Sequence, residues 1–496
     1  MKNKKKNIKK KVNQDITNEN YQTEVTFEGL HNKKPVTRRD FLATGLIPFA
    51  ASIVTPSLLQ VIGINNAHAQ GASRCSAGGS ASQMPGFINV NLGGGSGLSS
   101  HAIPLDKGGQ MISSYSKIGL GTRAQLSNQT SIEFGNSVWY ANSTFLEGLK
   151  ETAGNAINNT SFVSVCVESR DDTAENKIDI SGMVDKVRSG EMLPGIFGNR
   201  NRAAMVAPKA PVNINNVDDL ERSILLTGDW QQQLGGKANQ EKLIKLVSSM
   251  NDRQLRDIAS MTYGSKLQNL VKCAGIKNSD LISRDELGTD PMIVGGDVTD
   301  YAGVWGVDAD TGSNSRNYVF GSAAFNAIKG NAPLANLMMG GYDYHDNTRT
   351  NGDEKDRVAG QMVGRILASA AQMNKEVFCT VTTDGCVTSP DSEIPGEAVW
   401  TSDGGTRGMW YMFAFSPNGR PNLKDQSTVK GSQLGSFKEG QGVDESEVIG
   451  GIAEIAAAGV FLNYLGFAGQ IEKFNEVVGR GIISESDYDK INKFGG

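Results

Sequence analysis

The sequence has little histidine, with four residues in 496. His31 and His68 lie in an N-terminal segment that we expect to be removed, which leaves His101 and His345 in the mature chain. Zinc centres in proteins rely on histidine and cysteine ligands, so a histidine-rich zinc centre is excluded. The five cysteines include no Cys-x-x-Cys pair, which argues against a thioredoxin-type redox protein.

Composition narrows the class of protein further. Hydrophobic residues make up 38% of the chain and charged residues 21%, and the mean hydropathy is −0.32. These values exclude a polytopic membrane protein, a coiled coil and a mostly disordered chain. At roughly 150 residues per domain the length allows two or three domains, or one large α/β domain with insertions.

The N-terminal 69 residues have the parts of an export signal in the expected order. A basic polar region runs to Val36, and Thr37-Arg-Arg-Asp-Phe-Leu42 resembles the twin-arginine signature. A moderately apolar run, 43–64, follows, and Ala67-His-Ala69 is a small-x-small cleavage site. Gly45, Pro48 and Pro56 interrupt the apolar run, which disfavours an uncleaved membrane anchor. We therefore predict a twin-arginine signal peptide over 1–69.

Export has consequences for charge, compartment and partners. Removal of 1–69 takes away 11 of the 49 Lys and Arg and 5 of the 53 Asp and Glu, so the net charge becomes −10 rather than −4. An acidic surface disfavours nucleic-acid binding. The predicted location is the periplasm or the cell exterior, and the predicted partners are the twin-arginine translocase and a cell-envelope protein. In that oxidising compartment, Cys379 and Cys386 suit a disulfide that closes a loop after a strand.

The rest of the chain predicts an α/β fold, with a mostly parallel central sheet flanked by helices. Short apolar runs bounded by turn residues are typical of buried parallel strands, and they fall at 87–92, 162–167, 334–339, 377–382 and 410–415. Apolar residues at helical spacing over 353–373 predict a crossover helix between two of these strands. The apolar run 448–468 lies in a predicted helix, 445–474, that holds Glu454 and Asn463, so a buried packing helix is favoured over a membrane span.

These elements define the expected domains. A flexible leader covers 70–85, and the α/β domain covers 86–475 with a helical insertion at about 216–290. A C-terminal tail covers 476–496, and no stable membrane span is expected in the mature chain.

Candidate site residues follow the predicted strands, because ligands in open α/β sheets bind beyond the carboxyl ends of the strands. The first strand runs into Gly93–Gly97, the glycine loop, where the backbone can come close to a ligand. This loop lacks the lysine of a phosphate-binding loop and the spacing of a dinucleotide-binding loop, so nucleotide binding is disfavoured. Ser96 lies within the glycine loop, and Ser99, Ser100 and His101 follow it. Carboxylates follow or precede the four other strand ends.

Four residues form the predicted metal site. Asp343 and His345 are two apart, so on an extended strand both side chains point the same way and can share one ion. Asp384 and Asp403 lie near two other strand ends. Such a set favours one divalent cation held mainly by oxygen, with Mg²⁺, Ca²⁺ or Mn²⁺ more suitable than Zn²⁺. The alternative is that Asp343 ties a loop and His345 is a hydrogen-bonded structural residue.

The chain resembles a bacterial family of twin-arginine-exported proteins of unknown function, related to the alkaline phosphatase superfamily. That family shows Gly-Gly-x-Asp-Gly-Leu, Gly-Gly-Trp-Asp-Thr-His, Ser-Glu-Phe-Gly-Arg and Gly-Thr-Asp-His-Gly motifs in this order. Their counterparts here are Gly94-Gly-Ser-Gly-Leu98, Gly340-Gly-Tyr-Asp-Tyr-His345, Thr383-Asp-Gly-Cys386 and Ser402-Asp-Gly-Gly405. The resemblance spans most of 87–420 and implies an alkaline-phosphatase-like sheet.

Two departures from the family pattern affect function. Ser96 stands where the family has an aspartate, and Gly404 stands where it has a histidine. Both positions would supply metal ligands, and the loss of a ligand weakens a metal site severely. We therefore expect a degenerate scaffold used for binding or structure. The alternative is a metal-dependent hydrolase of phosphate or sulfate esters, with Ser96, Ser99 or Ser100 as the nucleophile.

Overall fold

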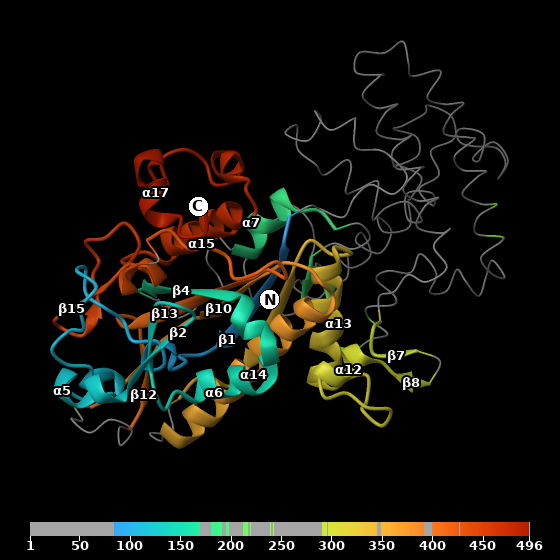
Figure 1. Cartoon of the computed structure of the whole chain (residues 1–496), viewed down its shortest axis with the longest axis horizontal. Helices are drawn as coiled ribbons and strands as arrows, with labels where there is room; N and C mark the ends of the chain where they lie inside the picture. Colours follow the sequence, from blue (N-terminus) through green and yellow to red (C-terminus); the bar gives the residue numbers. More distant parts are fainter. Residues whose placement is uncertain are drawn as a thin grey trace, which may run out of the picture.

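The computed structural model in Figure 1 describes most of the chain after the predicted leader. The described residues are 84–168, 180–190, 195–197, 212–216, 219, 239, 242, 290–294, 296–344, 349–390, 399–425 and 427–495. The predicted signal peptide, nearly all of the leader and most of the predicted helical insertion lie outside them.

An eight-stranded sheet of order β14-β4-β13-β10-β1-β9-β5-β6 forms the centre of the described fold. Every pairing in it is parallel except the two made by β13. The α/β prediction with a mostly parallel sheet is therefore confirmed. The strands are β1 (Gly86–Gly93), β4 (Thr160–Val167), β5 (Ile196–Phe197), β6 (Val212–Asn213), β9 (Ala335–Gly340), β10 (Val377–Thr383), β13 (Gly408–Phe415) and β14 (Gln433–Leu434).

All five strands predicted from the apolar runs are present in this sheet, but β13 runs in the opposite direction to the prediction. It pairs antiparallel with β10 on one side and with β4 on the other. Between β10 and β13 the chain forms a hairpin of β11 (Cys386–Thr388) and β12 (Thr401–Gly404). A parallel return requires a crossover connection, usually a helix. The hairpin turns the chain back, so β13 is antiparallel although it is as apolar and as buried as its neighbours.

Helices cover both faces of the sheet, as Figure 1 shows. One core contains Ile88, Val90 and Leu92 of β1 and the inner faces of α6 (Thr144–Ala153), α13 (Arg316–Lys329) and α14 (Arg349–Gln372). The other core contains Phe87 and the helices α7 (Ile180–Val187), α15 (Ala453–Phe467), α16 (Phe474–Val477) and α17 (Tyr488–Ile491). Phe87 thus points to one core, and Ile88, Val90 and Leu92 point to the core on the opposite face. This alternation is expected of a strand that is buried on both faces of a sheet.

Smaller elements complete the described part of the chain. Two-stranded sheets pair β2 (Thr130–Glu133) with β3 (Ser137–Tyr140), β7 (Ile293–Val294) with β8 (Asp297–Val298), and β15 (Phe437–Lys438) with β16 (Gly442–Val443). Two short helices are α5 (Arg123–Leu126) and α12 (Asp300–Val304).

The two predicted long helices are present with different bounds. Helix α14 connects β9 to β10 and begins four residues before the predicted start at 353. Helix α15 is shorter than the predicted 445–474, and most of its residues are buried. Asn463, the polar residue inside it, donates from Nδ2 to the carbonyl oxygen of Ile491 at 2.9 Å. Among the described residues, no helix combines the length and the apolar character needed to cross a membrane.

The C-terminal residues expected as a tail pack onto α15. Ile483, Ile491 and Phe494 belong to the same core as that helix, and the backbone N–H of Lys493 donates to Oδ1 of Asn463 at 2.7 Å. The amide of one buried asparagine therefore holds the C-terminal segment against α15.

The predicted disulfide between Cys379 and Cys386 is wrong, because the two cysteines are not bonded to each other. Cys379 lies inside β10, which continues to Thr383. An extended chain advances about 3.3 Å per residue, so Cys386 is carried beyond the Cα separation of roughly 7 Å at which a disulfide can close. The Sγ of Cys386 instead donates to the carbonyl oxygen of Gly404 at 2.7 Å.

Candidate functional site

The glycine loop lies at the carboxyl end of β1, where the ends of β9 and β10 meet it. The N–H of Gly94 donates to Oδ1 of Asp384 at 2.5 Å, and the N–H of Gly385 donates to the carbonyl oxygen of Gly94 at 3.1 Å. On the other side, a β-carbon on Gly94 would lie 2.3 Å from the backbone nitrogen of Asp343. Two of the predicted ligands, Asp343 and Asp384, therefore flank the same glycine.

The structure does not describe the side chains of the other two predicted ligands. His345 lies outside the described residues, and for Asp403 only the backbone, in β12, is described. Over the described part of the chain, no three His, Cys, Asp or Glu side chains form a group that could hold a metal ion.

The three predicted nucleophiles are closed off from solvent. Ser96 and Ser99 are each 1% exposed and Ser100 is 0% exposed. The Oγ of Ser100 donates to the carbonyl oxygen of Ile118 at 2.7 Å, so this hydroxyl is engaged in holding a turn. The Oγ atoms of Ser96 and Ser99 are buried and have no hydrogen-bond partner within the described structure. None of the three is therefore paired there with a group that could take its proton, as a nucleophilic serine requires.

Trp400, just before β12, packs against Gly97 of the glycine loop. Its ring is fully buried and stacks on Tyr344 with 5.5 Å between the ring centroids. A β-carbon on Gly97 would come within 2.5 Å of the ring, and one on Gly352 of α14 would come equally close. We expected the glycines to let a ligand approach the backbone. At Gly97 the group that approaches is the protein's own indole.

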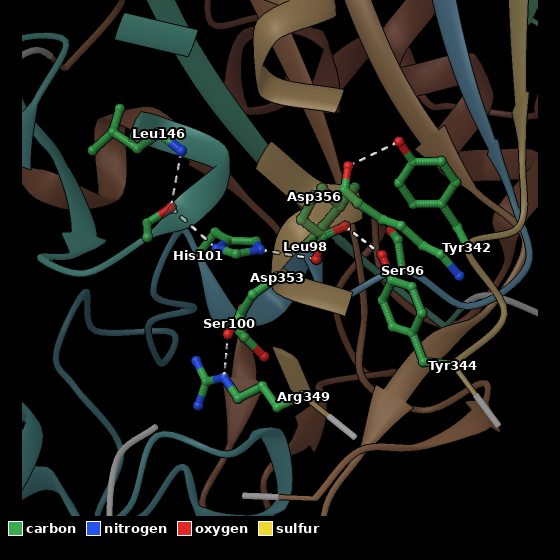
Figure 2. Close-up of polar contacts among 12 residues, drawn as sticks. Ser96, Leu98, Ser100, His101, Leu146, Tyr342, Tyr344, Arg349, Asp353 and Asp356 are labelled. Atoms are coloured by element: carbon green, nitrogen blue, oxygen red, sulfur yellow. Dashed lines mark hydrogen bonds and ion pairs between the residues drawn. The ribbon is translucent and has the colours of Figure 1, made fainter. Parts of the chain in front are cut away.

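Beneath this loop, a chain of hydrogen bonds runs between buried polar side chains (Figure 2). Nδ1 of His101 lies 3.1 Å from Oγ of Ser143, and Nε2 lies 3.0 Å from Oδ2 of Asp356. The hydroxyl of Tyr344 donates to Oδ1 of the same carboxylate at 2.7 Å. His101 and Asp356 are 0% exposed and Ser143 is 3% exposed.

One arrangement of protons satisfies every group in this chain of hydrogen bonds. Ser143 is the N-cap of α6, and its Oγ accepts a hydrogen bond from the N–H of Leu146 at 3.1 Å. Its own hydroxyl proton is then free to point at Nδ1 of His101. With Nδ1 as the acceptor, a neutral imidazole carries its proton on Nε2 and donates it to Asp356.

A second carboxylate on α14 lies at the edge of this network. Nε of Arg349 donates to Oδ2 of Asp353 at 3.2 Å, and Nη1 donates to the carbonyl oxygen of Gly119 at 2.6 Å. Burial raises the pKa of Asp353, the positive charge of Arg349 opposes the rise, and the charge of Asp356 adds to it. Burial and the same Asp356 charge hold the pKa of Tyr344 well above its ordinary value, so its hydroxyl keeps its proton and donates.

Of this buried network, the sequence singled out only His101. Asp356 could have been found, because it is a carboxylate on the buried face of an amphipathic helix, in line with Gly352 and Ala359. Ser143 could not have been singled out, because a serine directly before a helix is an ordinary N-cap residue.

Comparisons with known protein families and with curated proteins give no match to this chain. The class defined by the described structure is therefore an α/β protein with a mostly parallel sheet, a closed glycine loop at its carboxyl edge and a buried Ser-His-Asp-Tyr network below it.

Proposed function

We propose that this chain is an exported cell-envelope protein in which the carboxyl edge of an alkaline-phosphatase-like sheet serves binding or assembly rather than ester hydrolysis. The twin-arginine signature and the cleavage site before Gln70 support export to the periplasm or the cell exterior. The translocase is the partner during export, and an envelope protein is the partner afterwards. The acidic net charge of the mature chain supports a partner other than nucleic acid.

The observation that favours binding over hydrolysis is the closure of the glycine loop. Trp400 packs on Gly97 of this loop, and Ser96, Ser99 and Ser100 are at most 1% exposed. A nucleophile must reach its substrate at about 3 Å with a base in hydrogen-bond reach. Neither condition is met at this loop.

A second candidate function, a metal-dependent hydrolase of phosphate or sulfate esters, rests on Asp343 and Asp384. Both flank Gly94, Asp343 is exposed and Asp384 is half-buried. Asp343 follows β9 and Asp384 follows β10, the two strands that pair with β1 on either side, and carboxylates are suitable oxygen ligands for Mg²⁺, Ca²⁺ or Mn²⁺. In this function the cation would polarise the ester oxygen.

Metal content and ester turnover of the exported protein, purified without chelator, separate the two functions. We expect less than stoichiometric Mg, Ca, Mn and Zn by elemental analysis, and no turnover of p-nitrophenyl phosphate or p-nitrophenyl sulfate. Stoichiometric metal that is lost in Asp384→Asn and retained in Asp308→Asn, an exposed loop carboxylate, would favour the hydrolase. Turnover that follows the metal would overturn the binding function.

A further inference from the structure

We propose that Ser143, His101 and Asp356 form an acyl-transfer site at the N-terminus of α6, whose nucleophile is distinct from the serines of the glycine loop and whose activity is independent of the function proposed for that loop. Serine nucleophiles need a base in hydrogen-bond contact, and the base needs a third group to orient it. The two distances, 3.1 Å from Oγ of Ser143 to Nδ1 of His101 and 3.0 Å from Nε2 to Oδ2 of Asp356, meet both needs.

The roles of the ring nitrogens are exchanged relative to a serine protease, where Nε2 faces the serine. Either nitrogen of a neutral imidazole can accept a proton while the other donates, so Nδ1 of His101 is a competent base. Tyr344 holds the second oxygen of Asp356 at 2.7 Å. The carboxylate is therefore fixed on both oxygens and can stabilise the imidazolium that forms when His101 takes the serine proton.

The start of α6 supplies groups that can stabilise an oxyanion. In the first turn, the N–H of Leu146 donates to Oγ of Ser143, and the N–H of Glu147 donates to the carbonyl oxygen of Ser143. The N–H groups of Thr144 and Phe145 are the first two of the helix, which have no intrahelical acceptor. Helix N-termini favour negative charge, and the buried hydroxyl of Thr144 has no partner among the described residues.

The surroundings of Ser143 and its chemistry define the substrate class. Ala141 and Asn142 are exposed, Thr144 is half-buried and Ser143 is 3% exposed, so the serine lies directly beneath the surface. A hydroxyl activated by a neighbouring imidazole attacks an acyl carbon. The substrate class is therefore an ester of a carboxylic acid.

The reaction balances without a metal or a redox partner. Oγ of Ser143 attacks the carbonyl carbon as its proton passes to Nδ1 of His101. The bond from that carbon to the leaving oxygen then breaks, and the leaving alcohol takes the proton from Nδ1. A water molecule attacks the acyl-serine in the same way, which releases the carboxylic acid and restores the Ser143 hydroxyl.

Phenylmethylsulfonyl fluoride and p-nitrophenyl acetate test this site on the exported full-length protein. We expect one sulfonyl adduct, mapped to Ser143 by peptide mass spectrometry, and loss of p-nitrophenyl acetate turnover in step with its formation. His101→Asn should slow both reactions at least tenfold. Ser446→Ala, which changes an exposed serine far from α6 in the sequence, should leave both unchanged.

A purely structural role of Ser143 is distinguished by a variant that keeps the helix cap. Asparagine is a strong N-cap residue but not a nucleophile, so Ser143→Asn should retain the melting temperature and lose the adduct and the turnover. The sulfonyl adduct is mapped on the wild-type protein, so this part of the test does not depend on the folding of any variant. An unmodified Ser143, an adduct on another serine, or an adduct rate that His101→Asn does not change would each overturn the proposal.

Discussion

The indole of Trp400 lies on Gly97 so closely that a β-carbon at this glycine would come within 2.5 Å of the ring. The same β-carbon would lie 2.9 Å from Oδ2 of Asp356. The glycine loop, the hairpin that follows β10 and the buried carboxylate of α14 are therefore packed as one unit. A glycine at position 97 is required by this packing.

The first prediction concerns this contact. Gly97→Ala should lower the free energy of unfolding by about 1–3 kcal/mol, the usual cost of forcing a methyl group into a filled core. Gly340→Ala is the matched control, because a β-carbon there meets no atom within 4 Å. Urea unfolding of the two variants checks the prediction, and equal stability of both would contradict the packing described for Trp400.

A second prediction concerns Arg188, which is 1% exposed. Its guanidinium donates to the carbonyl oxygens of Ala327 and Ala332 at 2.8 Å and of Pro333 at 2.5 Å. Burial lowers the pKa of Arg188. Arg188→Met should leave these buried carbonyls unpaired and cost about 2–4 kcal/mol of unfolding free energy.

The exposed Arg480 provides the control for this change. Arg480→Met should alter the unfolding free energy by less than about 0.5 kcal/mol, as surface substitutions usually do. If chemical denaturation gave the same small effect for both arginines, the hydrogen bonds of Arg188 would be of no consequence for stability.

The third prediction is a pH dependence with a definite sign. Burial raises the pKa of Asp353 above its ordinary value of 3.8, so the folded state binds this proton more tightly than the unfolded state. The contribution of Asp353 to stability is therefore greatest below pH 3.8 and falls as pH rises through the raised pKa. Relative to wild type, Asp353→Asn should gain stability across this window, as measured by urea unfolding from pH 3.5 to 6.5.

Asp308 is the control with the opposite sign. Its pKa is lowered by the hydrogen bond from Thr311, so its contribution to stability is present above its ordinary pKa and lost as pH falls through the lowered value. Asp308→Asn should therefore lose stability relative to wild type as pH rises. A pH-independent difference between wild type and Asp353→Asn would show that burial does not perturb this carboxyl.

The fourth prediction addresses export. Replacement of Arg38 and Arg39 by lysine should retain the protein in the cytoplasm with its signal peptide uncleaved, because the twin-arginine pair is the feature that the signal depends on. Cell fractionation with mass analysis of the N-terminus checks this result. Lys33 and Lys34 replaced by glutamine serve as the control, since they lie outside the signature, and processing at Gln70 should continue.

Sequence patterns predicted the sheet well because continuous apolar runs of five or six residues leave a buried strand as the main solution. The run over 377–382 became β10, and the run over 162–167 became most of β4. Strand direction was predictable only where a helix such as α14 intervened. It was wrong for β13, because turn residues such as Pro390 and the Pro395-Gly396 pair mark a turn between the strands without fixing the direction of the next strand.

The candidate site was predicted in part. Asp343 and Asp384 do flank Gly94, since the ends of parallel strands meet at one edge of the sheet. The burial of Ser96, Ser99 and Ser100 could not be read locally, because a serine in a glycine-rich loop has the same sequence pattern whether it is open or covered. Trp400, which packs on Gly97 between these serines, lies about 300 residues later in the chain.

By itself, the sequence determined the class of fold and the order of the central elements, because each depends on residues that are neighbours in the chain. Only the tertiary structure decided which polar groups meet. Ser143 and His101 are 42 residues apart, and His101 and Asp356 are 255 residues apart. Their contact is set by how β1, α6 and α14 pack around a shared core, where an unpaired polar group is costly and a bonded one is retained.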